Sequence, residues 1–330
     1  MAKIFKSYEF FLFLLLITAW IFIGLINPAF FSLVTLLDMI RIQTVFIIMA
    51  LGLLPVFILG GIDMSFVAIS ALATYPLHIY LLEIDYQGGA WIYFLVAILV
   101  GLAVGLLEGL LINSFKLDIF NMSLGMNMLI YGAILFFVGS FDNFTMTTAL
   151  RGWNNKFIFT VQNPASGETG LHVAFFIILA VAIPMHLFLK RTVAGRAIYA
   201  IGSNRDVAIR TGFNIRKITL IVMALLGMIS GLGGITFSAI STAFYPILLM
   251  KKPIEVIAAV VLGGAAITGG RGTVLGTILG SILVGLINQA LVYLNIPTQW
   301  FDALIGLVFI AYATFQVFSN RINTEHMAKV

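Results

Sequence analysis

The sequence predicts an all-α polytopic membrane protein with about ten transmembrane helices, and its composition and its long apolar runs support this fold class. Hydrophobic residues make up 61% of the 330 residues and charged residues 9%, whereas soluble domains carry about 25% charged residues. The mean hydropathy is +1.11. A chain of this composition cannot cover a compact soluble core with polar side chains, so the bilayer is its first expected partner.

Ten apolar runs approach or exceed the length of about 20 residues that crosses a hydrocarbon core of about 30 Å as a helix. The runs cover residues 8–26, 44–60, 65–82, 90–115, 119–139, 171–189, 217–240, 253–268, 272–294 and 298–318. The eighth is short enough to be a broken or re-entrant segment. A transmembrane β-barrel is excluded, because its strands are about 10 residues long and alternate polar with apolar side chains.

The first run is expected to remain as a helix. Lys3 and Lys6 precede it, as basic residues precede a signal peptide, but Asn27 to Phe30 offers no small-x-small cleavage site. With ten spans both termini lie on one side, and the excess of Lys and Arg marks the cytoplasmic side. If the termini are cytoplasmic, the outside holds five of the 18 basic residues, namely Arg41, Arg151, Lys156, Lys251 and Lys252.

Two loops stand out by length. The cytoplasmic loop 190–217 is basic and contains a short helix signal over Asn204 to Thr211, with Ser203 as cap, Asp206 three residues later and Gly212 as the stop. A helix of about two turns is unstable alone in water, so it should pack on the protein or on a partner. A solvated basic loop would satisfy the charge rule equally well. The external loop 140–170 could be a cap over a pore mouth, a docking surface or unstructured.

Glycine-rich breaks interrupt two apolar runs, one at Gly60-Gly61 with Asp63 and Ser65, and one at Gly263-Gly264 followed by residues 268–272. Non-helical backbone at membrane depth persists only where it is buried in protein or lines a wet cavity. Both breaks are therefore candidate hinges or pathway elements, although Asp63 could simply cap a helix end.

Polar atoms also enter the fourth and fifth runs. Asn121, Ser123 and Asn127 lie at the start of the fifth, with Ser123 and Asn127 on one helix face. Glu108 lies inside the fourth run, where a charge is costly and is usually functional or paired, unless it extends to the interface.

Glycines at four-residue spacing predict close helix packing in the fourth and ninth runs. They are Gly101, Gly105 and Gly109, and Gly272, Gly276 and Gly280. A short sequence similarity between Gly109 to Asn113 and Gly285 to Asn288 suggests two halves related by an inverted repeat.

Several kinds of chemistry are missing. The chain has no cysteine, no phosphate-binding loop, no nucleophile elbow and no paired histidines with ligand spacing. We therefore expect no catalytic residue, no metal and no cofactor, and no nucleic-acid partner is needed to explain the net charge of +5.

Three stretches together resemble the permease subunits of ribose-type carbohydrate ABC importers, a group that includes permeases for furanose sugars and furanosyl signal molecules. Residues 60–65 look like a signature of that family, residues 195–212 match its cytoplasmic loop, and residues 258–264 with 269–273 match its third signature. The resemblance covers nearly the whole chain.

The resemblance implies one permease domain over residues 1–330 with the inverted-repeat type II importer architecture, in a bacterial inner membrane. It implies a second permease copy or homologue, two ATPase subunits and an extracytoplasmic solute-binding protein as partners, and a small polar solute such as a sugar. The cytoplasmic loop would be the coupling helix, formed by Ser203, Asn204, Arg205, Asp206, Ala208, Ile209, Arg210, Thr211 and Gly212.

The sequence departs from the family at Asp118 to Asn121, at Tyr131-Gly132 and at Glu108, a position that is usually neutral there. Since the fifth span is thought to line the pathway in such permeases, the solute stays open, as does the choice between homodimer and heterodimer. Two alternatives remain: an ion-coupled secondary transporter, and a permease of the branched-chain amino-acid ABC group.

Overall fold

The computed structural model describes residues 8–163, 167–247, 252–311 and 314. By length and composition, seven of its helices could cross a membrane: α1 (Tyr8–Ile26), α2 (Leu33–Leu59), α3 (Phe66–Glu83), α4 (Trp91–Phe115), α5 (Ile119–Phe137), α9 (Ile215–Ser241) and α11 (Val274–Tyr293). An eighth is α6 (Phe175–Arg191), if it is joined with α7 (Val193–Ser203) across a bend of 72°. The all-α polytopic prediction is confirmed.

The predicted eighth and tenth runs contain shorter helices, α10 (Pro253–Leu262) and the helix Trp300–Ala311. Within the described residues the count by this criterion is therefore seven or eight rather than ten. The inverted repeat stays a prediction.

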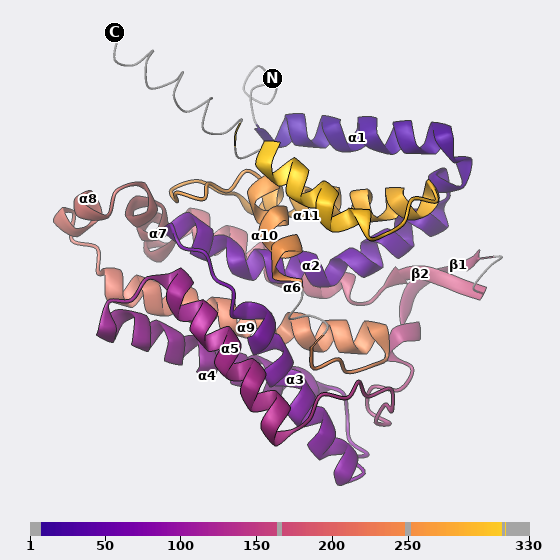
Figure 1. Ribbon diagram of the computed structural model, residues 1–330, viewed down its shortest axis with the longest axis horizontal. Helices are drawn as coiled ribbons and strands as arrows, with labels where there is room; N and C mark the ends of the chain where they lie inside the picture. Colours follow the sequence, from indigo (N-terminus) through magenta and orange to yellow (C-terminus); the bar gives the residue numbers. More distant parts are fainter. Residues whose placement is uncertain (1–7, 164–166, 248–251, 312–313, 315–330) are drawn as a thin grey trace.

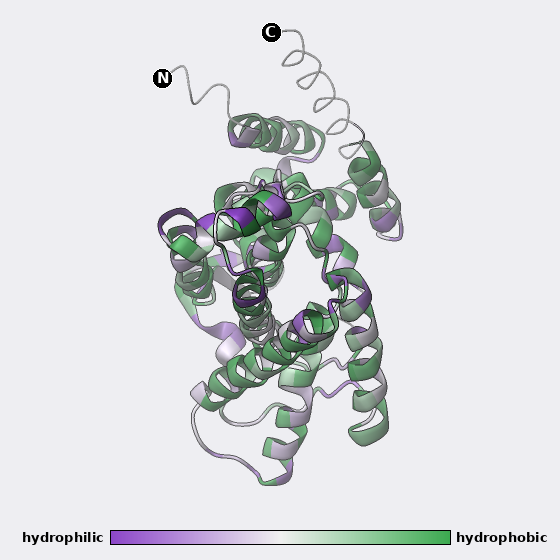
Figure 2. Ribbon diagram, turned by 90° about the vertical axis from the view of Figure 1, so that its left-hand side faces the viewer, coloured by the Kyte–Doolittle hydropathy of each residue, from purple (hydrophilic) through white to green (hydrophobic). Residues whose placement is uncertain are grey.

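Two small elements mark opposite ends of the molecule. The two-turn helix α8 (Arg205–Arg210) lies at one end, and the hairpin of β1 (Phe157–Asn163) and β2 (Gly167–His172) lies at the other (Figure 1). Most of the long helices run between these ends, and Figure 2 looks along them from the α8 end. The outer helices are strongly hydrophobic (Figure 2), as expected of surfaces that face lipid. We refer below to the α8 end and the hairpin end.

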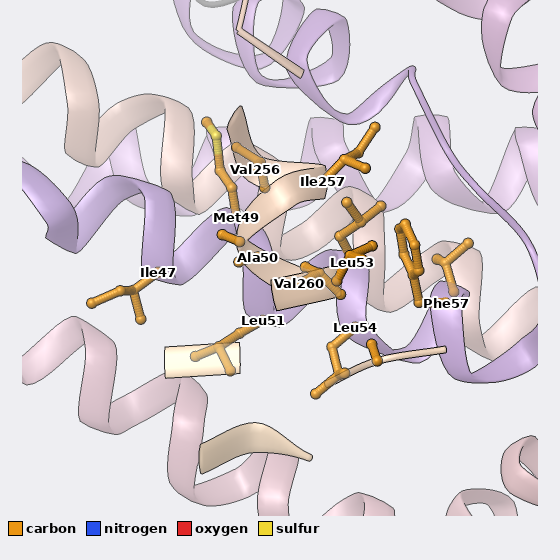
Figure 3. Packing of buried hydrophobic residues seen from close by; sticks show 14 of the residues in the cluster. Ile47, Met49, Ala50, Leu51, Leu53, Leu54, Phe57, Val256, Ile257 and Val260 are labelled. Carbon is orange, nitrogen blue, oxygen red and sulfur yellow. The ribbon is translucent and has the colours of Figure 1, made fainter. Parts of the chain in front are cut away.

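The helix α2 is the centre of the packing. It contacts α6, α9, α10 and α11, and every residue from Ile47 to Leu59 is buried. Figure 3 shows the side chains of this part of α2 beside Val256, Ile257 and Val260 of α10. Because lipid is as apolar as these side chains, their close packing stabilises the fold mainly through dispersion contacts rather than through escape from water.

Glycine packing between helices is confirmed. A Cβ atom on Gly101 would lie 2.1 Å from the Gly227 carbonyl oxygen, and one on Gly105 would lie 2.2 Å from that of Met223, so α4 and α9 are in backbone contact. In α11, Gly276 and Gly280 approach α10 in the same way. Gly272 was predicted to belong to this helix, but it precedes the Thr273 cap of α11 and has a φ of +154°.

Several predicted boundaries were wrong. The second span begins at Leu33 rather than at residue 44, because the Ser32 hydroxyl caps it by accepting a hydrogen bond from the Thr35 N–H (3.1 Å). The sixth begins at Phe175, since Leu171 belongs to β2. The loop 140–170 is structured where it is described: it contains the short helix η3 (Trp153–Asn155) and most of the hairpin. A second short helix, η2 (Pro28–Phe31), joins α1 to α2.

Candidate functional site

The predicted coupling loop folds into two helices rather than one. Thr192 caps α7, its hydroxyl accepting from the Gly195 N–H (2.9 Å). Asn204 caps α8, its Oδ1 atom accepting from the N–H groups of Asp206 and Val207 (3.1 Å each). The prediction of Ser203 as the cap was wrong: Ser203 is the last residue of α7, whereas Asn204 has the extended backbone conformation that a cap requires. Gly212, with a φ of +86°, follows the end of α8 as predicted.

One side chain of α8 is buried in the protein, and the others are exposed. Ala208 is 1% exposed and belongs to the main apolar core, whereas Val207 is 52% and Ile209 54% exposed. The other predicted coupling residues are exposed, namely Ser203, Asn204, Arg205, Asp206, Arg210, Thr211 and Gly212. Val207 was missed in the sequence, although its position one residue before Ala208 could have indicated it. Ala208 therefore anchors α8, and Val207 and Ile209 are its free apolar side chains.

The helix α7 contacts the end of α2, next to the first glycine break, and the later part of the second break. A Cβ atom on Gly202 would lie 1.8 Å from the Ile58 carbonyl oxygen, near the end of α2, and 2.6 Å from the Gly270 nitrogen. The Gly270 N–H donates to the same Ile58 oxygen (2.8 Å), and the Tyr199 hydroxyl donates to the Gly272 oxygen (2.7 Å). Backbone contacts thus connect α7, the helix directly before α8, to the end of α2.

A buried polar cluster lies at the break between α2 and α3. Asp63 Oδ1 accepts hydrogen bonds from the N–H groups of Ser65 (2.7 Å) and Phe66 (3.1 Å), so Asp63 caps α3 as one interpretation of the sequence had it. The Ser65 hydroxyl oxygen lies 2.8 Å from Asp63 Oδ1 and 2.9 Å from Glu108 Oε2 of α4. All three side chains are 0% exposed.

This cluster has too few protons for two charged carboxylates. A hydroxyl carries one hydrogen and can donate to one carboxylate at a time. Asp63 Oδ1 already accepts two backbone N–H groups, which favours its charged form. The two contacts of the Ser65 oxygen therefore require a proton on one of the two carboxyl groups, and the backbone N–H groups at Asp63 favour Glu108 as the group that carries it. We interpret Glu108 as a neutral hydrogen-bonding group between α4 and α3.

The fifth span contributes two of its three predicted polar residues to the same region. Ser123 Oγ accepts from the Met64 N–H (3.0 Å), and Asn127 Nδ2 donates to the Met64 oxygen (2.6 Å). Asn121 is exposed and takes no part. Gly61 packs against Ile119, the first residue of α5.

The first glycine break lies against the later part of the second break, but not against Gly263 and Gly264. A Cβ on Gly60 would lie 3.5 Å from the Thr268 oxygen, so the first break meets the later part of the second. Gly263 packs instead against the backbone of Gly276, and Gly264 against the ring of Tyr8. The structure therefore brings together most of the predicted pathway residues, but Gly263, Gly264 and Asn121 lie apart from them.

The hairpin is attached to α2. The Thr169 hydroxyl donates to Asp38 Oδ1 (2.6 Å), the Arg41 guanidinium donates to the Asn154 side-chain oxygen, and it lies 5.6 Å from the Phe157 ring centre. These polar residues of α2 hold the hairpin end in place.

His172 of β2 is 2% exposed. Its Nδ1 atom accepts from the Ala174 N–H (3.1 Å), which leaves the hydrogen on Nε2, 3.1 Å from the Trp153 oxygen. Burial lowers the pKa of this imidazole, as does Arg41 nearby, while the bond to the Trp153 carbonyl opposes the shift. The folded hairpin thus holds a neutral histidine. Among the described residues, no cluster of three or more His, Cys, Asp or Glu could hold a metal ion.

Residues 35–313 of the chain match the family described as the permease component of branched-chain amino acid transport systems. The chain is 29% identical over 288 residues to the ribose import permease protein of Haemophilus influenzae, covering 87% of this chain and 86% of that protein. It is 29% identical to the fructose import permease protein of Bifidobacterium longum (82% and 78% covered). It is 27% identical to an autoinducer 2 import system permease protein of Yersinia enterocolitica (89% and 78% covered). No solved structure matches the chain.

Proposed function

This chain belongs to the family of transport-system permease components whose members it matches over residues 35–313, and on that premise we propose that it is the membrane-spanning permease of an ATP-driven importer. It forms one permease domain that carries a solute through the bilayer and breaks no covalent bond. ATP is hydrolysed by a separate ATPase, and the energy reaches the permease through α8.

The exposed pair Val207 and Ile209 carries this proposal. Both are more than half exposed on a helix of six residues, which has too few hydrogen bonds to persist alone. Arg205 and Arg210 flank them, so α8 has an apolar centre with a polar rim, as protein interfaces do. A groove of the ATPase that covers these two side chains would complete the helix.

The contacts below α8 supply a route for coupling. Closure of the ATPase displaces α8, which Ala208 anchors to the body, and α7 passes the movement to Ile58 and the glycine break through Gly202 and Tyr199. The transport cycle is then a shift between two packings of α2 and its neighbours.

The orientation and the partners follow from the energy source. The α8 end lies in the cytoplasm of a bacterial inner membrane, together with both termini, in line with the excess of Lys and Arg predicted for that side. The hairpin end faces outward and receives an extracytoplasmic solute-binding protein. A second permease copy or homologue completes the assembly.

The solute is a sugar. The similar proteins named above import ribose, fructose and autoinducer 2, and their likeness extends over most of this chain. These relatives favour a sugar over the branched-chain amino acids that the family description names.

The proposal is tested in proteoliposomes that hold the permease with the ATPase and binding protein of its own importer. Ile209→Asp, which puts a charge into the apolar centre of α8, should abolish ATP-driven sugar uptake while membrane insertion is unchanged. The matched control is Ile209→Leu, which keeps an apolar side chain at the same position and should retain uptake. Uptake that is driven by an ion gradient without an ATPase would instead identify a secondary transporter.

A further inference from the structure

Two adjoining cavities lie between α2, α9, α10 and α11 in the half of the molecule near the hairpin end. The larger has a volume of about 530 Å³ and the smaller about 220 Å³. They share the side chains of Ile42, Phe46, Phe237 and Gln289. The larger cavity falls within the range of about 300–1,000 Å³ that small-molecule sites occupy.

Charged and amide side chains line both cavities beside a larger apolar part, although only 9% of the chain is charged. Asp38 and Arg41 line the larger cavity and Gln43, Lys252 and Glu255 the smaller. A lipid-facing hollow would not tolerate such groups, because each unsatisfied polar group in hydrocarbon is costly. The two cavities are therefore wet.

Gln43 points to a ligand. Its side chain is 6% exposed, and its buried Oε1 atom has no hydrogen-bond partner. The amide is held in place by Gly285 of α11, since a Cβ atom there would lie 2.3 Å from the amide carbon. The Nε atom of Arg41 is likewise buried and without a partner. A buried amide oxygen that nothing satisfies is rare in native proteins, so it needs a donor from a bound molecule or from water.

Each charged side chain of the lining has a hydrogen-bond partner within the chain. Asp38 accepts from Thr169, Arg41 donates to Asn154, and Lys252 forms an ion pair with Glu255. The two acidic and two basic groups leave no net charge. What remains for a ligand are the Nε–H group of Arg41, the amide donors and acceptors, and the aromatic rings of Phe46 and Phe237. A neutral polyhydroxylated molecule fits such a lining better than an anion, a cation or a zwitterion.

The cavities end where α2 becomes tightly packed. Gln43 lies ten residues after the start of α2, or about 15 Å along the helix axis at 1.5 Å per residue. From Ile47 onward α2 is buried, and in Figure 3 its side chains meet those of α10. The polar hollow thus reaches from the hairpin end to about mid-membrane, and an apolar plug closes it toward the α8 end.

We propose that this hollow is the solute-binding site of the permease and that it takes a neutral polyol of monosaccharide size, with Gln43 and Gln289 as its polar contacts. The inference rests on the proposed function, because it assumes a transported solute. It places the solute beside α2, in a different part of the chain from the buried cluster of Asp63 and Glu108.

The absence of cysteine from the natural chain allows a direct test in membranes of the full-length protein. Gln289→Cys should react with a membrane-impermeant methanethiosulfonate reagent applied from the hairpin side. D-Ribose or D-fructose should slow the reaction, about threefold at a concentration of twice the dissociation constant. The matched control is Ser281→Cys on the same helix, which is 0% exposed and should not react.

The labelling results test the position of the site and its preference for polyols separately. Labelling that neither sugar slows would overturn the proposed site. Protection by L-leucine but by neither sugar would overturn the polyol class.

Uptake in the reconstituted complex separates the site from the proposed function. Gln43→Met and Gln289→Met each remove an amide while keeping the side-chain volume, and should raise the KM for sugar uptake about tenfold, the effect of one or two lost hydrogen bonds. Ser281→Ala should leave the KM unchanged. An unchanged KM in both methionine variants overturns the site. If uptake proves to need an ion gradient instead of ATP but still responds to these variants, the site is supported and the proposed importer function fails.

Discussion

A single methyl group at Gly202 should uncouple ATP hydrolysis from transport. Gly202 of α7 lies against the carbonyl of Ile58 and the nitrogen of Gly270, and an alanine Cβ would be 1.8 Å and 2.6 Å from these atoms. Ordinary carbon contacts begin at about 3.5 Å, so α7 and the end of α2 must separate by more than 1 Å. The substitution therefore acts directly on the contact between α7 and α2.

The magnitude follows from two contributions. Overpacking at a tight contact costs about 1–3 kcal/mol. The hydrogen bond from Gly270 to Ile58, at 2.8 Å, would be stretched or lost, which adds about 1 kcal/mol. Together they destabilise the coupled packing by about 2–4 kcal/mol, or about 30-fold or more in an equilibrium constant.

The assay compares sugar uptake and ATP hydrolysis in the same proteoliposomes, both normalised to inserted permease. Gly202→Ala should lower ATP-driven uptake by more than about tenfold, while ATP hydrolysis continues, since α8 and its exposed side chains are unaltered. The control is Gly306→Ala, where no atom lies within 4 Å of an added Cβ. Normal uptake in Gly202→Ala would refute the proposed route through α7.

Three further predictions concern the interior and the hairpin. Glu108→Gln should change the free energy of unfolding by less than about 1 kcal/mol, because an amide can replace a neutral acid as donor to Ser65. Glu108→Ala, which removes the hydrogen bond, should lower it by about 1–3 kcal/mol. Thermal unfolding in detergent distinguishes the two variants, and equal losses would contradict a protonated Glu108. Gly227→Ala should destabilise the protein by about 1–3 kcal/mol, because its Cβ would lie 2.0 Å from the Gly101 oxygen, and the same measurement on Gly125→Ala, an open position, is the control. Because the pKa of His172 is lowered in the fold, its neutral form is favoured, so hairpin stability is full above about pH 6.5, the ordinary histidine pKa, and falls as the pH drops from there through the folded pKa. Hydrogen exchange of the hairpin from pH 7.5 to 5 measures this, and an equal response in His172→Gln would show that another group is responsible.

The sequence predicted the position of most spans but not their full length, and α2 shows the physical reason. Hydropathy begins the second span at Thr44 because Asp38, Arg41 and Gln43 interrupt the apolar pattern before it. In the structure these residues are helical: Asp38 bonds to Thr169 of the hairpin, Arg41 bonds to Asn154 of η3, and Gln43 lines a cavity. The polar residues that interrupt the apolar pattern at the start of α2 are thus the ones that line the proposed solute site.

Long-range contacts explain the other differences. The position of α8 could be predicted from Gly212 and the basic residues around it, but the choice between Ser203 and Asn204 as the cap depends on where α7 ends. The pairing of Glu108 with Ser65 joins residues far apart in the sequence, so the sequence could indicate a costly buried acid but not its partner. Hairpin formation in the external loop likewise depends on its attachment to α2, which no local pattern reveals.

The most direct test of the central claim uses the cysteine-free chain. Val207→Cys places one thiol on the exposed face of α8, and a short bifunctional thiol reagent should join it to a cysteine in the groove of the ATPase. A specific cross-link should form in the assembled complex and block ATP-driven sugar uptake, and it should be absent for Thr160→Cys at the hairpin end. A complex that transports sugar with ATP but never cross-links at Val207 would contradict the central claim.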